Sequence, residues 1–174
     1  SRGLGDVYKR QIDVYALKEA ANYAFEYVGG RTQVTVKAVS GIPDGVYVLG
    51  NRYANYNTYP DYLCRPADMN GPTCSVPVAT LCQGFSPQNA CFAYANGKWT
   101  VNGASMARGI AWFSGNLEVG NGVYVNTFLA TGNINTAGGH RTTSPNYAGY
   151  RVTCQNQPPA NSSLSINANF QALV

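Results

Sequence analysis

The chain has little charge: only 11% of its 174 residues are Asp, Glu, Lys or Arg, which is about half the fraction usual in soluble domains. From Met69 to Val174 there is one acidic residue, Glu118, and the chain has one histidine, His140. Glycoside hydrolysis by the usual route needs two carboxylates, and a Ser/His/Asp site would have to recruit His140. The sequence therefore disfavours an enzyme, and we expect no catalytic residues.

Other site motifs are also missing. No carboxylate cluster suggests calcium, no histidine or close cysteine group suggests zinc, and no Walker lysine follows the glycine-rich segments. The basic residues of the C-terminal half are scattered between Lys98 and Arg151, which disfavours a nucleic-acid patch. No apolar run approaches the roughly 18 residues of a spanning helix. We therefore expect no metal, no cofactor and no nucleic acid, and membrane attachment only through a missing upstream segment.

Five cysteines are present, but none forms a CxxC pair. Cys64 and Cys74 bracket one short loop and Cys82 and Cys91 bracket another, so pairing within each couple is the simplest connectivity. Closing a loop of about ten residues stabilises a fold by roughly 2 to 3 kcal/mol. Cys154 is left over, either with a partner beyond the end of the chain or as a buried free thiol. Disulfides predict an extracytoplasmic location: cell surface, periplasm or secreted.

The chain has the length of one domain. Its first eleven residues, SRGLGDVYKRQ, resemble a translated sequencing adapter and predict an artefact or a disordered tail. If so, the native N-terminus lies further upstream. The remainder predicts a single disulfide-braced α+β domain. Its expected parts are a helix over 12–30, a sheet with stapled loops over 33–104, and a repeat-containing β section over 105–174.

The expected helix is amphipathic, because its apolar residues recur at helical spacing. Gly29-Gly30 would end it with a left-handed residue. The residues on the predicted apolar stripe are Val14, Leu17, Ala21, Ala24, Phe25 and Val28.

Two hairpins are predicted downstream. Residues 33–39 and 46–49 are rich in β-branched side chains and flank the turn-forming SGIPDG, so we expect them to pair and to pack on the helix as an antiparallel sheet. Asn96-Gly97 predicts a type I′ turn. The expected cross-strand pairs at that turn are Ala95–Lys98, Tyr94–Trp99 and Phe92–Val101.

A repeat marks the C-terminal section. GNLEVGNG from Gly115 and GNINTAGG from Gly132 are the same element offset by 17 residues, and a fainter copy starts at Gly149. This spacing is typical of a β-solenoid, whose chain returns to the same place one layer on. We expect Gly115 and Gly132 to occupy equivalent turns of adjacent strands or coils.

Leu117 and Ile134 occupy the same position in the two copies, so we expect their side chains to stack as one layer that faces the inside of the coils. Asn116 and Asn133 predict a ladder of stacked side chains.

The segment RYANYNTYPDYL is the one candidate binding site. Tyr53, Tyr56, Tyr59 and Tyr62 recur every three residues, so an extended segment with three residues per turn would place four rings on one edge. Such a ladder suits stacking on sugar rings or on another protein. The alternative is a loop whose tyrosines cover the helix and hairpin.

The helical VYALKEAANYAFEYVGG, followed by strands and paired cysteines, resembles the extracytoplasmic part of a bacterial type IV pilin-like subunit, such as a major or minor pilin. The family's apolar N-terminal segment, with its cleavage site and early glutamate, would lie upstream of this chain. The resemblance implies a non-enzymatic structural subunit for filament assembly or surface adhesion, self-associating through the helix. One alternative is a secreted carbohydrate-binding or adhesin module with a β-solenoid tail that contacts host or surface glycans. The second alternative, which the shortage of acidic residues disfavours, is a polysaccharide-active enzyme.

Overall fold

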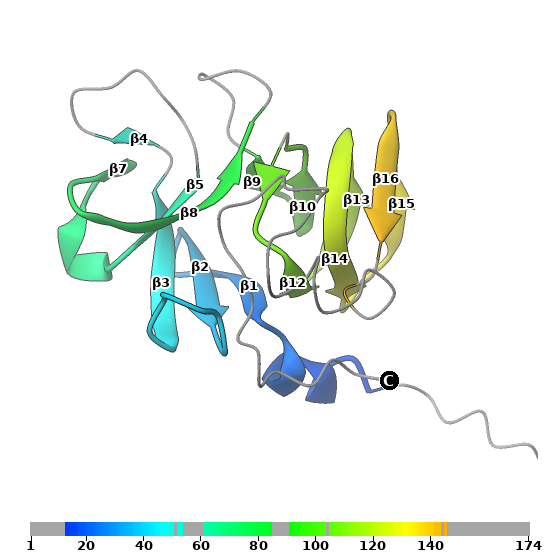
Figure 1. The fold of residues 1–174 in the computed structure, drawn as a ribbon, viewed down its shortest axis with the longest axis horizontal. Coiled ribbons are helices and arrows are strands. Elements are labelled where there is room, and N and C mark those ends of the chain that lie inside the picture. The colour runs from blue at the N-terminus through cyan, green and yellow to red at the C-terminus, as the bar shows by residue number, and fades with distance from the viewer. Residues whose placement is uncertain are drawn as a thin grey trace, which may run out of the picture.

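The structure is a computed structural model that describes residues 13–50, 52–53, 61–84, 91–103, 105–143 and 145. These residues form one mixed sheet of nine strands and two smaller sheets. In spatial order the large sheet contains β11 (Ser105–Met106), β8 (Pro77–Gln83), β5 (Asp61–Cys64), β3 (Gly45–Gly50), β2 (Arg31–Val36), β1 (Tyr23–Val28), β12 (Gly109–Phe113), β14 (Gly122–Ala130) and β16 (His140–Thr143). The second sheet contains β15 (Ile134–Thr136), β13 (Asn116–Val119), β10 (Lys98–Val101) and β9 (Phe92–Ala95), and the third β4 (Arg52–Tyr53), β7 (Thr73–Cys74) and β6 (Met69–Asn70). Figure 1 shows their arrangement.

The predicted α+β class and its N-terminal helix over 12–30 are wrong. The described part of that range contains a short 3₁₀ helix of five residues, η1 (Ala16–Ala20), followed by strand β1. The β1 sequence YAFEYV is rich in aromatic residues that favour strands. Backbone pairing decides the outcome, because β1 is hydrogen-bonded to β2 on one side and to β12 on the other.

The pair Gly29-Gly30 is a hairpin turn, not a helix end. Both glycines have positive φ, at 58° and 78°, and Val28 pairs with Arg31 across them. Consecutive left-handed residues between paired strands are the signature of a type I′ turn. A helix end and a hairpin turn both need a left-handed glycine, so the Gly29-Gly30 pair alone could not distinguish the two.

Both hairpins predicted downstream are confirmed. Strands β2 and β3 pair antiparallel, although they join the large sheet and do not pack on a helix. Asn96 and Gly97 have φ of 51° and 75°, as a type I′ turn requires. The observed partners across that turn are Ala95–Lys98, Tyr94–Trp99 and Phe92–Val101, the predicted register. Another short 3₁₀ helix, η2 (Pro66–Asp68), lies between β5 and β6.

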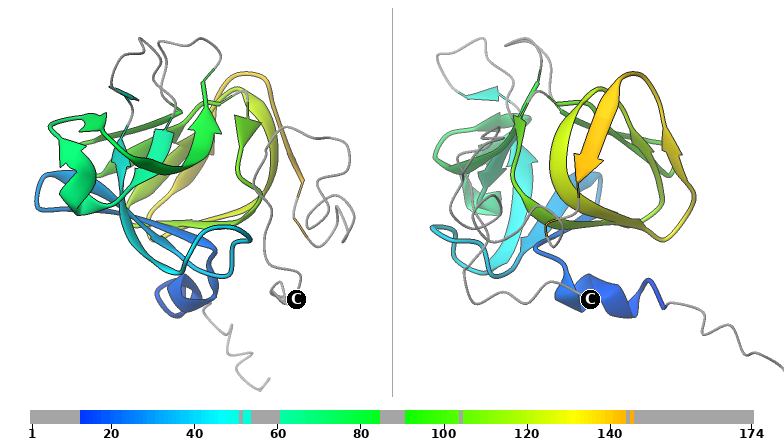
Figure 2. Two further views of the ribbon diagram at one scale, coloured as in Figure 1. Left: turned by 60° about the vertical axis from the view of Figure 1, so that its left-hand side comes forward. Right: turned by 45° about the vertical axis from the view of Figure 1, so that its right-hand side comes forward.

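The C-terminal strands form stacked coils. Strands β10, β13 and β15 pair in parallel along one side, while β12 pairs with β14 and β14 with β16 along another. The right-hand view of Figure 2 shows these strands winding around a common axis. The N–H of Gly132 donates to the carbonyl of Gly115 at 2.8 Å. The prediction that these two glycines occupy equivalent turns of adjacent coils is therefore confirmed.

An asparagine side chain links the coils at this turn. Oδ1 of Asn116 accepts the backbone N–H of Asn133, 17 residues further on, at 2.9 Å. In the turn between β13 and β14, Oδ1 of Asn121 likewise accepts the backbone N–H of Gly139 at 2.7 Å. Each asparagine thus hydrogen-bonds to the next coil's backbone. The copy that starts at Gly149 lies outside the described residues.

The predicted inward layer is only half right. Leu117 is buried, whereas its partner Ile134 is 45% exposed. The reason is position in the stack, because β15 is the last strand of its sheet. No later described coil covers Ile134.

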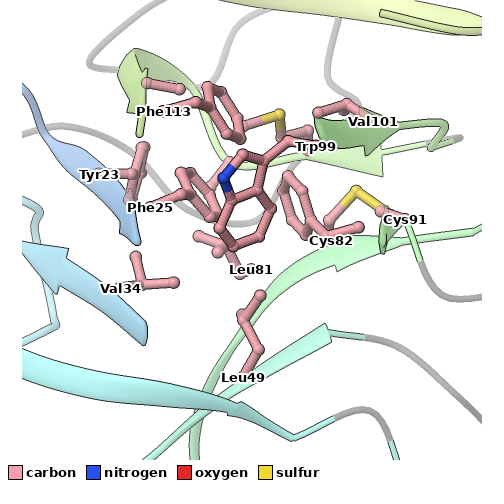
Figure 3. Close-up of a cluster of buried hydrophobic side chains, with 14 of the residues drawn as sticks. Tyr23, Phe25, Val34, Leu49, Leu81, Cys82, Cys91, Trp99, Val101 and Phe113 are labelled. Atoms are coloured by element: carbon pink, nitrogen blue, oxygen red, sulfur yellow. A yellow bond between two sulfur atoms is a disulfide. The ribbon is translucent and has the colours of Figure 1, made fainter. Parts of the chain in front are cut away.

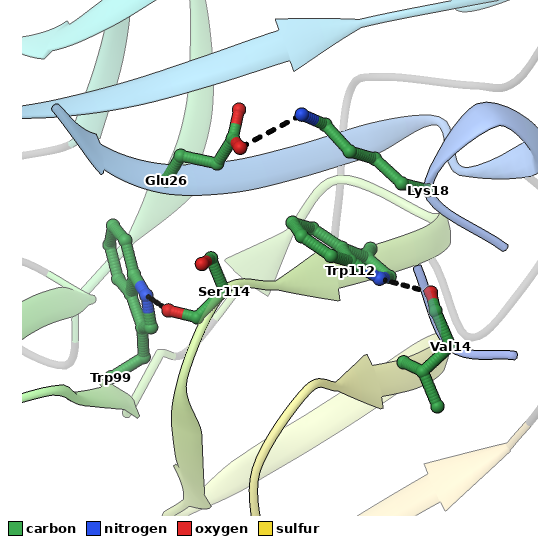
Figure 4. A network of polar contacts seen from close by, with 6 residues as sticks. All are labelled: Val14, Lys18, Glu26, Trp99, Trp112 and Ser114. Carbon is green, nitrogen blue, oxygen red and sulfur yellow. Dashed lines mark hydrogen bonds and ion pairs between the residues drawn. The ribbon is translucent and has the colours of Figure 1, made fainter. Parts of the chain in front are cut away.

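The core lies between the large sheet and the four-stranded second sheet. Trp99 occupies its centre, with Phe25 and Phe113 within 6 Å of its ring, and Figure 3 shows the Cys82–Cys91 disulfide beside it. The N–H of the Trp99 indole donates to the carbonyl of Ser114 at 3.1 Å, so this buried polar group has a partner (Figure 4).

Both predicted disulfides are present, Cys64–Cys74 and Cys82–Cys91. They indicate an oxidising, extracytoplasmic environment. Cys154 lies outside the described residues, as do residues 1–12. Among the helices that the structure describes, none is long and apolar enough to cross a membrane.

Side-chain contacts hold η1 against the large sheet. The Trp112 indole N–H donates to the carbonyl of Val14 at 2.7 Å, and Lys18 pairs with Glu26 at 2.8 Å (Figure 4). The Lys18 ammonium also lies 5.5 Å from the centre of the Trp112 ring. These contacts give the short segment a defined place without a long helix.

Candidate functional site

A groove of about 370 Å³ lies between two hairpin ends. One is the Gly29-Gly30 turn that joins β1 and β2, and the other is the turn at Gly71-Pro72 between β6 and β7. Strand β3 contributes Val48 and Leu49 to the lining, and both residues are buried. The groove therefore lies beside the end of β3, between the two turns.

The β1–β2 wall carries the aromatic side chain. Tyr27 and Thr32 are direct cross-strand partners, so both side chains project from the same face of the sheet. Tyr27 is 47% exposed, although its ring stacks on Tyr94 of β9 with centroids 4.4 Å apart and planes 19° apart. The stack fixes the orientation of the Tyr27 ring while leaving about half of the side chain open to solvent.

The opposite wall belongs to a single disulfide loop. Met69, Gly71 and Pro72 line the groove, and all three lie within the ten-residue separation of Cys64 and Cys74. Half-buried and exposed residues make up most of this loop, which leaves it little core of its own. The disulfide is therefore a main restraint on this wall.

Among the residues that line the groove, Arg31 is the charged one. The ion pairs found in the described part of the chain are Lys18–Glu26, Lys37–Glu19 and Lys98–Glu118, and none includes Arg31. The other lining residues are apolar, glycine or threonine. The lining of the groove thus includes a tyrosine, several apolar residues, a threonine and an arginine.

The predicted tyrosine ladder is only partly described. Tyr53 lies in β4, which pairs with β7 so that Tyr53 is opposite Cys74. Tyr62 is half-buried on β5 of the large sheet. Tyr56 and Tyr59 lie outside the described residues. Two ladder positions therefore fall in different sheets, and a ladder of four rings on one edge stays a prediction.

Sequence reasoning missed Tyr27 and Arg31, because it assigned Tyr27 to a helix and gave Arg31, just after that helix, no role. The signal that could have found them is YVGGR, in which two glycines separate β-prone residues. A hairpin turn at this point places Tyr27 and Arg31 at the same end of the sheet.

The buried carboxylate of Asp61 lies elsewhere and has a structural role. Its Oδ2 accepts the backbone N–H of Cys91 at 2.6 Å and that of Phe92 at 3.2 Å, so it anchors the second disulfide loop. Burial raises the pKa of Asp61 to about 7, although the two hydrogen bonds favour the ionised form.

The other titratable residues singled out by the sequence are separated. His140 is exposed on β16, whereas Glu118 on β13 pairs with Lys98 at 3.5 Å. Within the described ranges, no three His, Cys, Asp or Glu side chains gather where they could hold a metal ion.

Comparison with known proteins gives no assignment: no protein-family model, curated protein or solved structure matches this chain.

Proposed function

We propose that this chain is a non-enzymatic, extracytoplasmic glycan-binding module of the adhesin type, and that the Tyr27 groove binds a sugar ring. The stacked coils serve as a rigid scaffold beside the groove. The observation that carries the proposal is the half-exposed Tyr27 ring, held by Tyr94 in the wall of a concave site. Concave sites with an apolar lining and a few placed polar groups are where small ligands bind.

The chemistry of the groove suits a sugar. A pyranose ring has an apolar face of C–H groups that packs on an aromatic ring, and hydroxyls at its edge that need hydrogen-bond partners. Tyr27 offers the ring, and Thr32 offers a hydroxyl on the same face of the sheet. Because Tyr94 already holds Tyr27, binding would cost little side-chain ordering.

The pilin-like subunit stays a prediction with less support. Its proposed self-association used an N-terminal helix, and η1 with β1 occupies that part of the chain instead. A polysaccharide-active enzyme is also less supported, because the described residues that line the groove include no carboxylate. The groove favours the binding module over both.

A glycan array probed with the parent chain, Tyr27→Ala and Tyr15→Ala tests the proposal. Tyr15 is 70% exposed and does not line the groove, so its substitution is a matched control. We expect Tyr27→Ala to weaken binding by at least about tenfold, because the lost apolar contact is worth more than about 1.4 kcal/mol. Tyr15→Ala should bind as the parent does. Absence of binding by the parent, or full binding by Tyr27→Ala, would overturn the proposal.

A further inference from the structure

We propose that the groove selects sugars that carry a carboxylate, with Arg31 pairing to the carboxylate while the sugar ring packs on Tyr27. This inference rests on the proposed glycan-binding function and names its ligand class. It predicts acidic glycans, such as uronate-containing or sialylated ones, as the preferred partners.

Arg31 is available for such a pairing. It begins β2, is exposed and lines the groove beside Thr32. Its cross-strand partner is Val28, an apolar residue. The acid nearest along the hairpin, Glu26, is already paired with Lys18 at 2.8 Å. Arg31 is thus a cation at a binding groove in a chain with few charges.

The opposite wall does not neutralise this cation. Met69, Gly71 and Pro72 carry no charge, and the closest acid in sequence, Asp68, is half-buried in η2 and does not line the groove. An anionic ligand would therefore meet one guanidinium and no lining carboxylate among the described residues.

The guanidinium also fits the ligand geometrically. Its planar set of N–H donors matches the two oxygens of a carboxylate, and such charge-assisted pairs are stronger than neutral hydrogen bonds. A sugar carboxylate is attached to the ring at its edge. Arg31 and its partner Val28 leave the hairpin on the face opposite to Tyr27 and Thr32. Both Tyr27 and Arg31 line the groove, so a carboxylate at the edge of a ring packed on Tyr27 has to lie at the hairpin end to reach the guanidinium.

Two pairs of probes test the selectivity and distinguish the source of the carboxylate. The first pair is oligogalacturonate and its methyl ester, and the second is sialyllactose and lactose. Binding is measured by calorimetry for the parent, Arg31→Gln, Arg31→Lys and Arg65→Gln. Arg65 is exposed and lies outside the groove lining, so Arg65→Gln removes the same charge from a neighbouring surface.

We expect the parent to bind the acidic member of at least one pair about tenfold more tightly than its neutral partner. Arg31→Gln should abolish the preference, so that this variant binds the acidic and the neutral member of a pair equally, and Arg31→Lys should recover part of the preference. High salt should reduce the preference in the parent, and Arg65→Gln should behave as the parent.

Equal binding within both pairs, or a preference that survives Arg31→Gln, would overturn the selectivity while leaving glycan binding at Tyr27 intact. Failure to bind any of the four probes would overturn the selectivity, and the array result then decides the proposed function separately.

Discussion

Leu117 and Ile134 are direct partners in the parallel strands β13 and β15, yet Leu117 is 1% exposed and Ile134 is 45% exposed. They occupy the same place in consecutive coils. The difference arises because Leu117 is covered by the core, whereas Ile134 belongs to the last described coil. Sequence equivalence in a solenoid therefore does not imply energetic equivalence.

Truncating these two residues should have unequal effects. We expect Leu117→Ala to lower the free energy of unfolding by about 2 to 5 kcal/mol, because it leaves a cavity in the core. Ile134→Ala should cost less than about 1 kcal/mol, because much of its side chain is already in water. Urea unfolding followed by tryptophan fluorescence measures both, and equal losses would contradict the burial difference.

The close approach of coils at Gly115 predicts a specific intolerance. A Cβ at this position would lie 2.5 Å from the Gly97 carbonyl oxygen, and φ is +124°. Gly115→Ala should therefore lower the thermal midpoint far more than Gly41→Ala. At Gly41 φ is also positive, at +80°, but a Cβ meets nothing within 4 Å. Comparable shifts for the two variants would show that backbone strain, and not coil contact, limits this turn.

The two disulfides should differ in their effect on the groove. Replacing Cys64 and Cys74 by serine removes the covalent restraint on the wall formed by Met69, Gly71 and Pro72. Replacing Cys82 and Cys91 removes a restraint in the core instead.

Each pair of substitutions should cost about 2 to 4 kcal/mol of stability. Only the Cys64/Cys74 change should also weaken the glycan binding found on the array and raise hydrogen exchange in residues 65–73. If the Cys82/Cys91 variant lost binding to the same extent while folded, the first disulfide would have no special role in the groove.

Asp61 should make stability depend on pH. Burial raises its folded-state pKa to about 7 from an ordinary value of 3.8. Between these values the folded protein retains a proton that the unfolded chain releases. The contribution of Asp61 to the free energy of unfolding is therefore greatest below about pH 4 and falls as the pH rises to about 7. Above that pH it no longer changes.

The matched variant is Asp61→Asn, whose amide oxygen can still accept the N–H groups of Cys91 and Phe92. Unfolding free energies measured from pH 4 to pH 8 should show a smaller decline for Asp61→Asn than for the parent. Parallel curves for the two proteins would rule out Asp61 as the titrating group.

Local sequence was informative where a few adjacent residues specify a conformation. Asn96-Gly97 predicted both its turn and the pairing of Tyr94 with Trp99, because left-handed residues between two β-prone runs permit few alternatives. The spacing within Cys64–Cys74 and Cys82–Cys91 likewise led to the observed disulfides. The repeat at Gly115 and Gly132 predicted stacked coils, because similar repeats stack on one another in register.

The site was not predictable in this way, because residues of distant segments form it. Tyr27, Arg31 and Pro72 line one groove only after the hairpin and the disulfide loop have taken their places in the fold. The tyrosine spacing from Tyr53 to Tyr62 pointed to the neighbouring segment, since regular spacing was the only signal available there.

The sequence by itself determined the Asn96-Gly97 turn, the disulfide loops and the stacking of repeats, since each depends on residues close in the chain or on an internal repeat. Tertiary structure alone decided that the apolar segment after residue 20 is a strand. Asn22 accepts the N–H of Ile110, 88 residues away, and β1 then pairs in parallel with β12. An apolar periodicity near 3.6 describes which side chains avoid water, but the hydrogen-bond partners of the backbone decide between helix and strand.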